Sequence, residues 1–225
     1  MGTLIKRYKR FLADFRLEDG TVITAHCANT GSMRTCMEEG APGWLTYHDN
    51  PKRKLKYSWQ ACHMPDGWVG INTAMANGLV EEAIMEGVIG ELQNYSILER
   101  EKKYGNRSRI DILLRDEGRA SCYVEVKNVT LLLEEGVAAF PDAVTQRGAK
   151  HLEELVAVVE RGERAVLLYC VQRQSAAKVV PAREYDPHYA ATLEMAMSRG
   201  VEVYAYGVTH SLSGLSVTHP LPLEI

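Results

Sequence analysis

The stretch SCYVEVK at residues 121–127, preceded by SRIDILL at residues 108–114, decides the fold of most of the chain. Both segments are rich in aliphatic and β-branched residues, so we expect two neighbouring strands joined by a turn. Because side chains alternate between the faces of a strand, Glu125 and Lys127 project from one face, about 7 Å apart. Asp111 lies mid-strand, where an unpaired charge is unfavourable. If the two strands pair as a hairpin, Asp111 lies beside Glu125.

Two carboxylates that meet at one point repel each other unless a cation lies between them. Mg²⁺ prefers oxygen ligands and keeps several waters, one of which becomes a better nucleophile when bound. We therefore predict a Mg²⁺ site made by Asp111, Glu125 and an acid of the preceding helix, for which we choose Glu82 with Glu81 as the alternative. Lys127 would orient the water and stabilise charge on a phosphate, so the predicted catalytic residues are Asp111, Glu125 and Lys127. The alternative interpretation is an ordinary solvated sheet face.

Helical and strand patterns alternate around this pair of segments. Apolar residues at helical spacing predict a helix that Asn77 caps, a second that Pro141 and Asp142 open, and a third that ends at Gly200. Nearly continuous apolar residues at 165–171 predict a strand buried on both faces, and residues 201–207 add a last strand. This order predicts an α/β domain with a mixed sheet over residues 76–225.

The first 75 residues have a different pattern. Five short segments with β-branched and aromatic residues are separated by turn residues, at 10–17, 21–27, 43–47, 55–62 and 68–71. The sequence Glu18-Asp19-Gly20 is a hairpin signal because glycine adopts positive φ without strain. Five short strands in about 70 residues are typical of a small closed or partly closed barrel of the OB type. The predicted domains are therefore an OB-like barrel at 1–75 and an α/β domain at 76–225.

Composition excludes several classes of protein. The 225 residues carry 26 basic and 29 acidic side chains, and no apolar run approaches the length of about 20 residues that a membrane span needs. Charged residues near the start, among them Lys6, occupy positions where a signal peptide needs an apolar stretch. The five cysteines are an odd number without metal-ligand spacing, so we expect reduced, mostly buried thiols. We therefore expect a cytoplasmic protein with no membrane partner.

Basic residues gather in the N-terminal part of the chain. Residues 1–75 carry ten Lys or Arg and seven Asp or Glu, whereas residues 76–225 carry sixteen and twenty-two. The run PKRKLKYSW at 51–59 mixes cations with rings, a combination that suits phosphates and stacked bases. The predicted DNA-binding residues are Lys52, Arg53, Lys54, Lys56, Tyr57, Trp59, Arg147 and Lys150. The alternatives are a solvated hairpin with Tyr57 and Trp59 facing the core, and a polar helix face on which His151 is an ordinary surface residue.

Several longer motifs carry a family resemblance. They are RYKRFLAD at 7–14, HCANTGSM at 26–33, the segment from Tyr104-Gly105 to Asp111, VEVKNVTL at 124–131 and FPDAVT at 140–145. In this order they resemble the sugar fermentation stimulation protein A family. The Asp…Glu-x-Lys pattern is similar to that of the PD-(D/E)xK nuclease superfamily, with Ile110 in place of the proline.

The resemblance implies an N-terminal OB-like domain, a C-terminal PD-(D/E)xK nuclease-like domain and non-specific DNA binding, with a regulatory role in sugar (maltose) metabolism. We take DNA binding as the first prediction, with DNA as the partner. The alternative is a Mg²⁺-dependent nuclease that hydrolyses phosphodiester bonds, and only in that case is Mg²⁺ a cofactor. A third class, a non-enzymatic interaction protein with a vestigial nuclease fold, also stays open.

Overall fold

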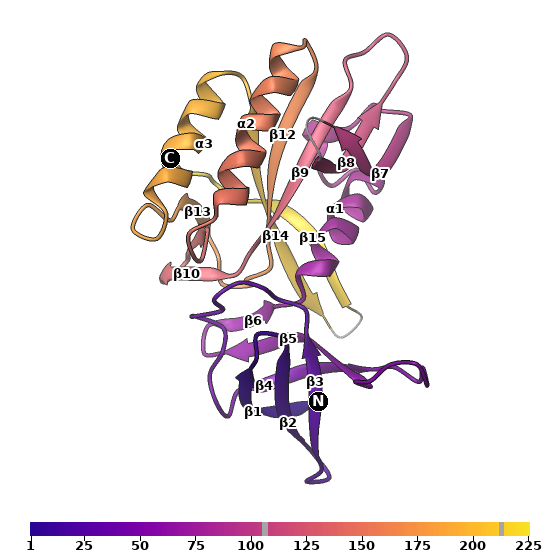
Figure 1. Ribbon diagram of the computed structural model, residues 1–225, viewed down its shortest axis with the longest axis vertical. Helices are drawn as coiled ribbons and strands as arrows, with labels where there is room; N and C mark the ends of the chain where they lie inside the picture. The colour runs from indigo at the N-terminus through magenta and orange to yellow at the C-terminus, as the bar shows by residue number, and fades with distance from the viewer. Residues whose placement is uncertain (105–107, 212–213) are drawn as a thin grey trace.

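The computed structural model describes residues 1–104, 108–211 and 214–225, and it consists of two domains stacked along its long axis (Figure 1). Residues 105–107 of the motif at 104–111 lie outside the described residues. The N-terminal domain is built from six strands: β1 (Gly2–Tyr8), β2 (Leu12–Leu17), β3 (Val22–Cys27), β4 (Pro42–Tyr47), β5 (Tyr57–Met64) and β6 (Gly67–Gly70).

The N-terminal strands form a closed barrel. Their order is β3-β2-β1-β4-β5-β6, and an additional parallel pairing of β3 with β5 closes the ring between Ala25 and Tyr57 and between Cys27 and Trp59. The β2–β3 turn places Gly20 at a φ of 83°, as the hairpin signal predicts. The interior is filled by alternate side chains, with Phe15 and Trp59 at its centre. The predicted OB-like barrel is therefore confirmed.

Strand β1 differs from the prediction, which begins the first strand at residue 10. Lys6 and Arg7 make this segment look like a basic terminus, but Leu4 is buried and the strand alternates buried with exposed positions. β1 pairs with both β2 and β4, so the barrel cannot close without it. The charged residues are tolerated because every second side chain of a barrel strand points outward into solvent.

The C-terminal domain is an α/β layer structure. Its helices are η1 (Thr73–Met75), α1 (Ala76–Met85), η2 (Gly90–Leu92), α2 (Gln146–Glu160) and α3 (Pro187–Ser198). Its strands are β7 (Ile97–Tyr104), β8 (Ser108–Arg115), β9 (Cys122–Val129), β10 (Leu131–Glu134), β11 (Val137–Phe140), β12 (Arg164–Val171), β13 (Lys178–Pro181), β14 (Glu202–Ser211) and β15 (Gly214–Pro220).

The main sheet of this domain is mixed, as predicted. Its order is β15-β14-β12-β9-β8-β7, with β9, β12 and β14 parallel in the centre and antiparallel strands at both edges. Helices α2 and α3 cover one face and α1 covers the other (Figure 1). β12 is buried on both faces, which explains its nearly all-apolar sequence. The polar edge strands β7 and β15 have no comparable signal and were not predicted.

Two predicted helix starts are corrected. The predicted second helix opens at Pro141, but α2 begins at Gln146, and the hydroxyl of Thr145 caps it by accepting from Gly148 N at 3.0 Å. Pro141 instead follows the short strand β11. Asn77 does not cap α1 either, because it lies inside the first turn of that helix. Its side chain is thereby free to reach the neighbouring sheet.

The two domains meet through an extensive polar interface. Gly70 N donates to Gln172 O at 2.8 Å, and Val69 forms an antiparallel backbone bridge with Arg173, so β6 pairs with the segment that follows β12. On the other side, Ser32 Oγ donates to Asp142 Oδ2 at 3.1 Å and Met33 N donates to the same oxygen at 3.2 Å. These contacts hold the domains on both sides of the space between them.

The remaining predictions from composition concern cysteines and membranes. All five cysteines are free and buried, as expected. Over the described residues, the helices are too short or too polar to span a bilayer.

Candidate functional site

Strand β9 presents Glu125 and Lys127 on the sheet face that α2 covers. Lys127 Nζ lies 2.6 Å from Glu125 Oε1, and the two side chains are 13% and 3% exposed. The strand alternation predicts this arrangement. An ion pair so deeply buried is costly unless its polar atoms are satisfied. Glu125 Oε2 is buried and has no hydrogen-bond partner among the described residues, so the pair has an unused acceptor.

Asp111 of β8 lies where β8 and β9 separate. Their pairing ends at Ile112 and Val124, so Asp111 has no opposite residue in the ladder. Its carboxylate fills the opening instead, because Oδ2 accepts from Val126 N at 2.8 Å and Oδ1 accepts from Asn77 Nδ2 at 2.8 Å. Asp111 is thus held against β9 at Val126, the residue after Glu125, at the point where the hairpin opens.

Helix α2 adds His151, which is buried and not the surface residue of the alternative interpretation. His151 Nε2 accepts from Arg147 Nε at 3.2 Å, so in the neutral ring the proton is assigned to Nδ1. Nδ1 then donates to Glu125 Oε1. Arg147 and His151 are i, i+4 neighbours on one helix, so their contact is local, whereas the contact of His151 with Glu125 depends on how α2 docks on the sheet.

The environment of the two carboxyls separates their pKa values. Burial and the charge of Glu125 raise the pKa of Asp111, although hydrogen bonds from Val126 and Asn77 act in the opposite direction. Burial alone also raises the pKa of Glu125, but the hydrogen bond from His151 and the charge of Lys127 outweigh it and hold that pKa below its usual value. Two neighbouring carboxyls with opposite shifts are typical of functional sites.

The structure does not bring the predicted third acid into the cluster. Glu82 is exposed on α1, and the alternative Glu81 pairs with Arg100 of β7 at 3.2 Å. Asn77, one turn before Glu81, is the α1 residue that reaches Asp111. Within the described part of the chain, three His, Cys, Asp or Glu residues do not gather in a metal-binding arrangement. The prediction for Glu82 is wrong, because its position on the helix turns it away from the sheet.

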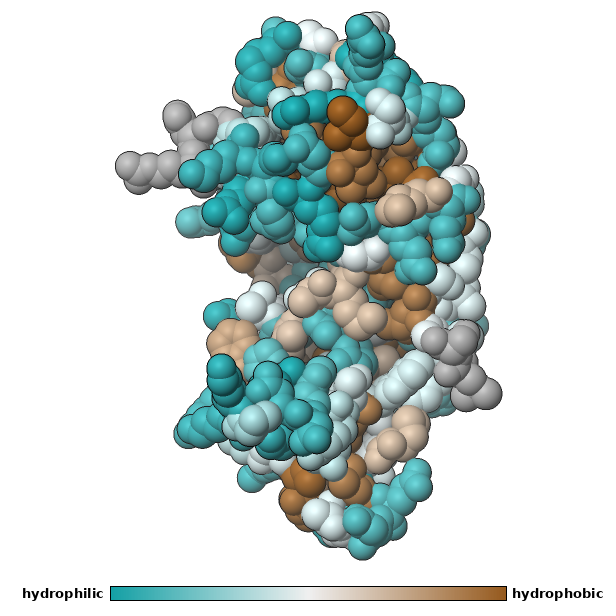
Figure 2. All heavy atoms as spheres, turned by 90° about the vertical axis from the view of Figure 1, so that its right-hand side faces the viewer, coloured by the Kyte–Doolittle hydropathy of each residue, from teal (hydrophilic) through white to brown (hydrophobic). Residues whose placement is uncertain are grey.

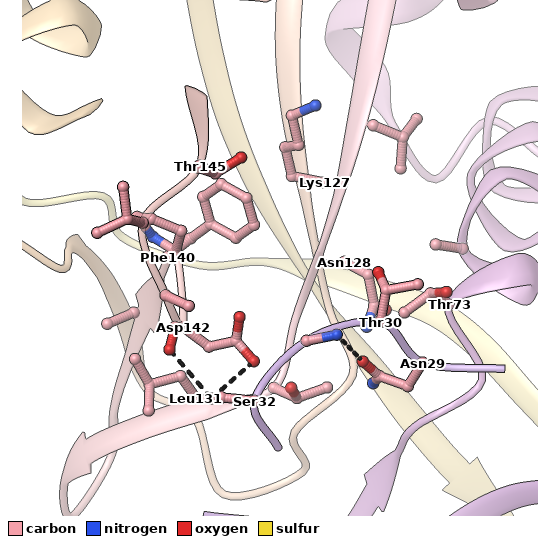
Figure 3. Close-up of a pocket in the computed structure, with 18 of the residues that line it drawn as sticks. Asn29, Thr30, Ser32, Thr73, Lys127, Asn128, Leu131, Phe140, Asp142 and Thr145 are labelled. Atoms are coloured by element: carbon pink, nitrogen blue, oxygen red, sulfur yellow. Dashed lines mark hydrogen bonds between the residues drawn. The ribbon is translucent and has the colours of Figure 1, made fainter. Parts of the chain in front are cut away.

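A cleft of about 830 Å³ opens beside this cluster, between the two domains. Figure 3 shows Lys127 at one end of it and the barrel loop with Asn29, Thr30 and Ser32 at the other. The outline of the space-filling view is indented between the domains (Figure 2). Phe140 lines the cleft from the C-terminal domain. The catalytic candidate Lys127 therefore lies in a space that both domains build.

The predicted DNA-binding run begins on the loop between β4 and β5, which extends from the barrel (Figure 1), and ends in the first residues of β5. Lys52 and Lys54 are exposed. Arg53 and Lys56 are half-buried, and they brace the loop through Ser58 Oγ at 2.9 Å and Asn50 O at 2.7 Å. Lys52 and Lys54 can therefore contact phosphates, whereas Arg53 and Lys56 stabilise the conformation of the loop.

The aromatic members of the run differ from the prediction. Trp59 is fully buried and packs edge-on against Phe15 in the barrel core, so its predicted contact with bases is wrong. The cause is its position: Trp59 is the third residue of β5 and lies on the inward face of that strand. Tyr57 is half-buried and packs against the exposed ring of Tyr47, near the end of the barrel. On α2, Arg147 and Lys150 are exposed, as phosphate contacts require.

One further pair of cationic residues, on the β7–β8 hairpin, was not predicted. Lys103 and Arg109 lie directly opposite each other in the β7–β8 ladder, and both are exposed. Like charges in this position are unfavourable unless an anion compensates them. Lys9 and Arg10 form the loop between β1 and β2, beside Phe11, whose exposed ring stacks on His26. OB barrels bind ligands through this loop and the β4–β5 loop. The sequence signal that could have identified Lys103 and Arg109 is their position on the two neighbouring strands of a hairpin.

The fold and the cluster together define a class of protein: an OB barrel joined to an α/β domain with an Asp, Glu and Lys cluster at the opening of two strands. The sequence profiles agree, because residues 5–71 match "SfsA N-terminal OB domain" and residues 74–214 match "Sugar fermentation stimulation protein RE domain". The chain belongs to this sugar fermentation stimulation protein family.

Relatives and a solved structure resemble the chain over its whole length. A sugar fermentation stimulation protein homolog of Rhodospirillum rubrum is 51% identical and covers 99% of this chain and 95% of its own length. The homolog of Saccharophagus degradans is 53% identical, with 98% and 95% covered. The structure of Pyrococcus furiosus SfsA in complex with Ca²⁺ superposes with a TM-score of 0.89 at 28% identity, covering 100% of this chain and 95% of the other.

Proposed function

We propose that this chain binds DNA without sequence preference and that its C-terminal domain hydrolyses phosphodiester bonds with the help of a divalent cation. The observation that carries this proposal is the contact of Lys127 Nζ with Glu125 Oε1, 2.6 Å long, beside Asp111 and at the end of an open cleft. Buried charges are expensive, so an arrangement of three of them next to a cleft is typical of a site that acts on a ligand.

Asp111 and Glu125 are the residues that would hold the cation. Their carboxylate oxygens are the donors that Mg²⁺ and Ca²⁺ prefer, and Glu125 Oε2 is a buried acceptor without a partner among the described residues. A bound divalent cation would lower the pKa of a coordinated water and neutralise charge on a phosphate. Two carboxylates suffice because Mg²⁺ retains several waters. The Ca²⁺ complex of the Pyrococcus furiosus protein supports the choice of a divalent cation.

The chain's own residues supply position and charge. The amine of Lys127, a residue that lines the cleft, would stabilise the negative charge that develops on the phosphate under attack. His151 holds Glu125 in place through Nδ1, and Arg147 fixes the tautomer of that ring. Asn77 and Val126 N hold Asp111. The carboxylates are thus oriented before any ligand arrives.

Binding to DNA would use contacts with the phosphate backbone. Lys52 and Lys54 of the barrel loop, and Arg147 and Lys150 of α2, are exposed cations on the two domains. Phosphate contacts carry little sequence information, so the affinity should fall steeply with salt and vary little with sequence. The proposal includes a role in the regulation of sugar (maltose) use, and the name of the relatives supports a link to sugar fermentation.

DNA binding without hydrolysis is the second candidate, and one observation favours it. Glu125 Oε1 is already engaged by Lys127 and His151, and both oxygens of Asp111 accept hydrogen bonds. A cation would have to compete with these contacts. In that case the cluster would be a structural network at the opening of the sheet.

Incubation of plasmid and short single strands with the purified chain distinguishes the two candidates. Mg²⁺ or Mn²⁺ is compared with chelator, and Asp111→Asn is compared with Asp49→Asn, which changes an exposed aspartate of the barrel loop. Hydrolysis requires a metal-dependent product that Asp111→Asn loses and Asp49→Asn keeps. A salt-sensitive gel shift without any such product would leave DNA binding alone. A thermal melt of each variant shows that it is folded.

A further inference from the structure

The interdomain cleft has the size and lining of a site for a single nucleotide. Its volume of about 830 Å³ lies in the range of small-molecule sites and is far too small for a duplex. The lining combines one aromatic ring, several uncharged polar groups, one carboxylate and cations at the rim. A site that contacted only phosphates would need the cations but not the aromatic ring or the uncharged polar groups.

Phe140 supplies the aromatic surface. It is half-buried at the end of β11, and Tyr169 and Tyr189 pack against it with ring centroids 5.7 and 5.2 Å away. These buried tyrosines fix the ring, and Figure 3 shows it turned toward the cleft. Stacking on a fixed ring is favourable for every base, because each base has a π-face.

Asp142 supplies an acceptor for the edge of a base. Ser32 Oγ and Met33 N hold its Oδ2, so the carboxylate cannot turn away, and Oδ1 keeps its acceptor capacity. A side chain at Gly31 would collide with this carboxylate, which shows how closely the barrel loop approaches it. Every base has an N–H donor on its pairing edge, and that edge is accessible only when the base is unpaired.

The cations lie where the phosphates of such a nucleotide would be. Lys127 is at one end of the cleft, and Arg10 of the β1–β2 loop lines it from the barrel. The guanidinium of Arg7, in contrast, is used to hold the barrel loop, with Nη2 2.9 Å from Asn29 O. A nucleotide stacked on Phe140 would therefore present a phosphate to Lys127.

We propose that the cleft takes one unpaired nucleotide of a single strand, with its base on Phe140 and at Asp142 and its phosphate at Lys127. The inference rests on the proposed function and names its substrate as single-stranded nucleic acid. Duplex DNA would be bound at the outer cations without entering the cleft. The contacts between the domains hold the cleft open in advance, so no closure is required.

Filling the cleft tests this proposal. Thr30 is exposed at the barrel side of the cleft, so Thr30→Trp would occupy the space without altering Asp111, Glu125 or Lys127. Thr21→Trp is the matched control, since Thr21 is an exposed threonine at the β2–β3 turn of the same barrel. The probes are a labelled single strand of about 12 nucleotides and the corresponding blunt duplex. Their binding is measured by fluorescence anisotropy in the presence of chelator, so that no hydrolysis occurs.

We expect Thr30→Trp to weaken single-strand binding about tenfold, which corresponds to the loss of one stacked base, and to leave duplex binding unchanged. Thr21→Trp should bind both probes like the natural chain. Equal single-strand affinities of Thr30→Trp and Thr21→Trp, or equal losses for both probes, would overturn the proposal. Asp142→Asn should reproduce part of the loss, because the amide replaces one acceptor oxygen.

The same variants separate this inference from the proposed hydrolysis. If no metal-dependent product forms on any substrate but Thr30→Trp loses single-strand binding, the cleft assignment stands and the catalytic proposal fails. If Mg²⁺-dependent products form equally with Thr30→Trp and the natural chain on both substrates, hydrolysis stands and the cleft assignment fails. Both stand if Thr30→Trp loses only the single-stranded products.

Discussion

Arg173 of the C-terminal domain donates from Nε and Nη2 to the two carboxylate oxygens of Asp66 in the barrel, at 2.8 and 2.6 Å. Its Nη1 also donates to Thr35 O at 2.7 Å. The Arg173 side chain is 3% exposed and that of Asp66 26%, so the pair is largely shielded from water. Bidentate pairs of this kind fix orientation as well as distance. This single side chain therefore ties the barrel to the sheet domain.

Asp66→Asn should destabilise the protein, because it leaves the buried guanidinium of Arg173 with a neutral partner. We expect a free energy of unfolding lower by about 2 kcal/mol, below the full cost of a broken buried pair since Asp66 is partly exposed. Denaturant unfolding measures the change, and Asp49→Asn on the exposed loop is the control. Equal stabilities of the two variants would show that the pair does not hold the domains together.

The same pair predicts a pH dependence. Burial raises the pKa of Asp66, but the hydrogen bonds from Arg173 and Ser175 outweigh it and lower that pKa overall. The unfolded state then binds a proton more readily than the folded state, so the stabilisation is present above the ordinary value of about 4. It is lost as the pH falls through the lower, folded pKa. Asp66→Asn should lack this acid-side loss.

Removal of the exposed loop cations should reduce the salt dependence of DNA binding. Each phosphate contact contributes about 0.7–0.9 to the slope of log affinity against log salt, so Lys52→Ala with Lys54→Ala should lower the slope by up to about 1.8. Anisotropy titrations at several salt concentrations measure it. Lys178→Ala, which removes a lysine paired with Glu224 on the other domain, should leave the slope unchanged. An unchanged slope in the double variant would exclude the loop from the interface.

The sequence was most informative where chemistry and strand geometry coincide. Glu125 and Lys127 are two residues apart on a strand, and the period of two alone places them on one face. Asp111 was identifiable because a charge between two isoleucines needs a partner. These predictions depend only on local geometry, which the sequence encodes directly.

Predictions that depend on how an element docks were less successful. The rotation of α1 decides whether Asn77 or Glu82 faces Asp111, and apolar spacing defines the buried face only to within about one residue. Trp59 shares the spacing and aromatic character of a base-stacking residue, but the closure of β3 on β5 turns it inward. His151 reaches Glu125 only because α2 packs across β9. Each outcome was decided by tertiary contacts between segments far apart in the chain.

His151 should act as a positioning residue for Glu125. His151→Ala removes the donor at Nδ1. We therefore expect the rate of hydrolysis to fall about tenfold to hundredfold, as for other residues that hydrogen-bond a metal-binding side chain and hold it in place. His151→Asn should restore part of the activity, since its amide can place an N–H near the position of Nδ1. Rates over a pH series and the unfolding free energy are measured for both. A uniform loss in both variants that follows stability alone would mean a purely structural role.

His210 of β14 predicts a second, separate pH dependence. Burial lowers the pKa of its imidazole from an ordinary value of 6.5 to about 4. Below about pH 6.5 the unfolded chain takes up a proton that the folded chain refuses, so stability declines as the pH falls from about 6.5 to about 4. The loss should reach about 2 kcal/mol, less than the full shift implies because the site retains some contact with solvent.

Urea unfolding at pH 7.5 and pH 5 measures this loss of stability. His210→Phe should flatten this part of the profile, whereas His219→Gln, at an exposed position of β15, should not. A natural chain with equal stability at both pH values would show that the imidazole is protonated as readily in the fold as in water.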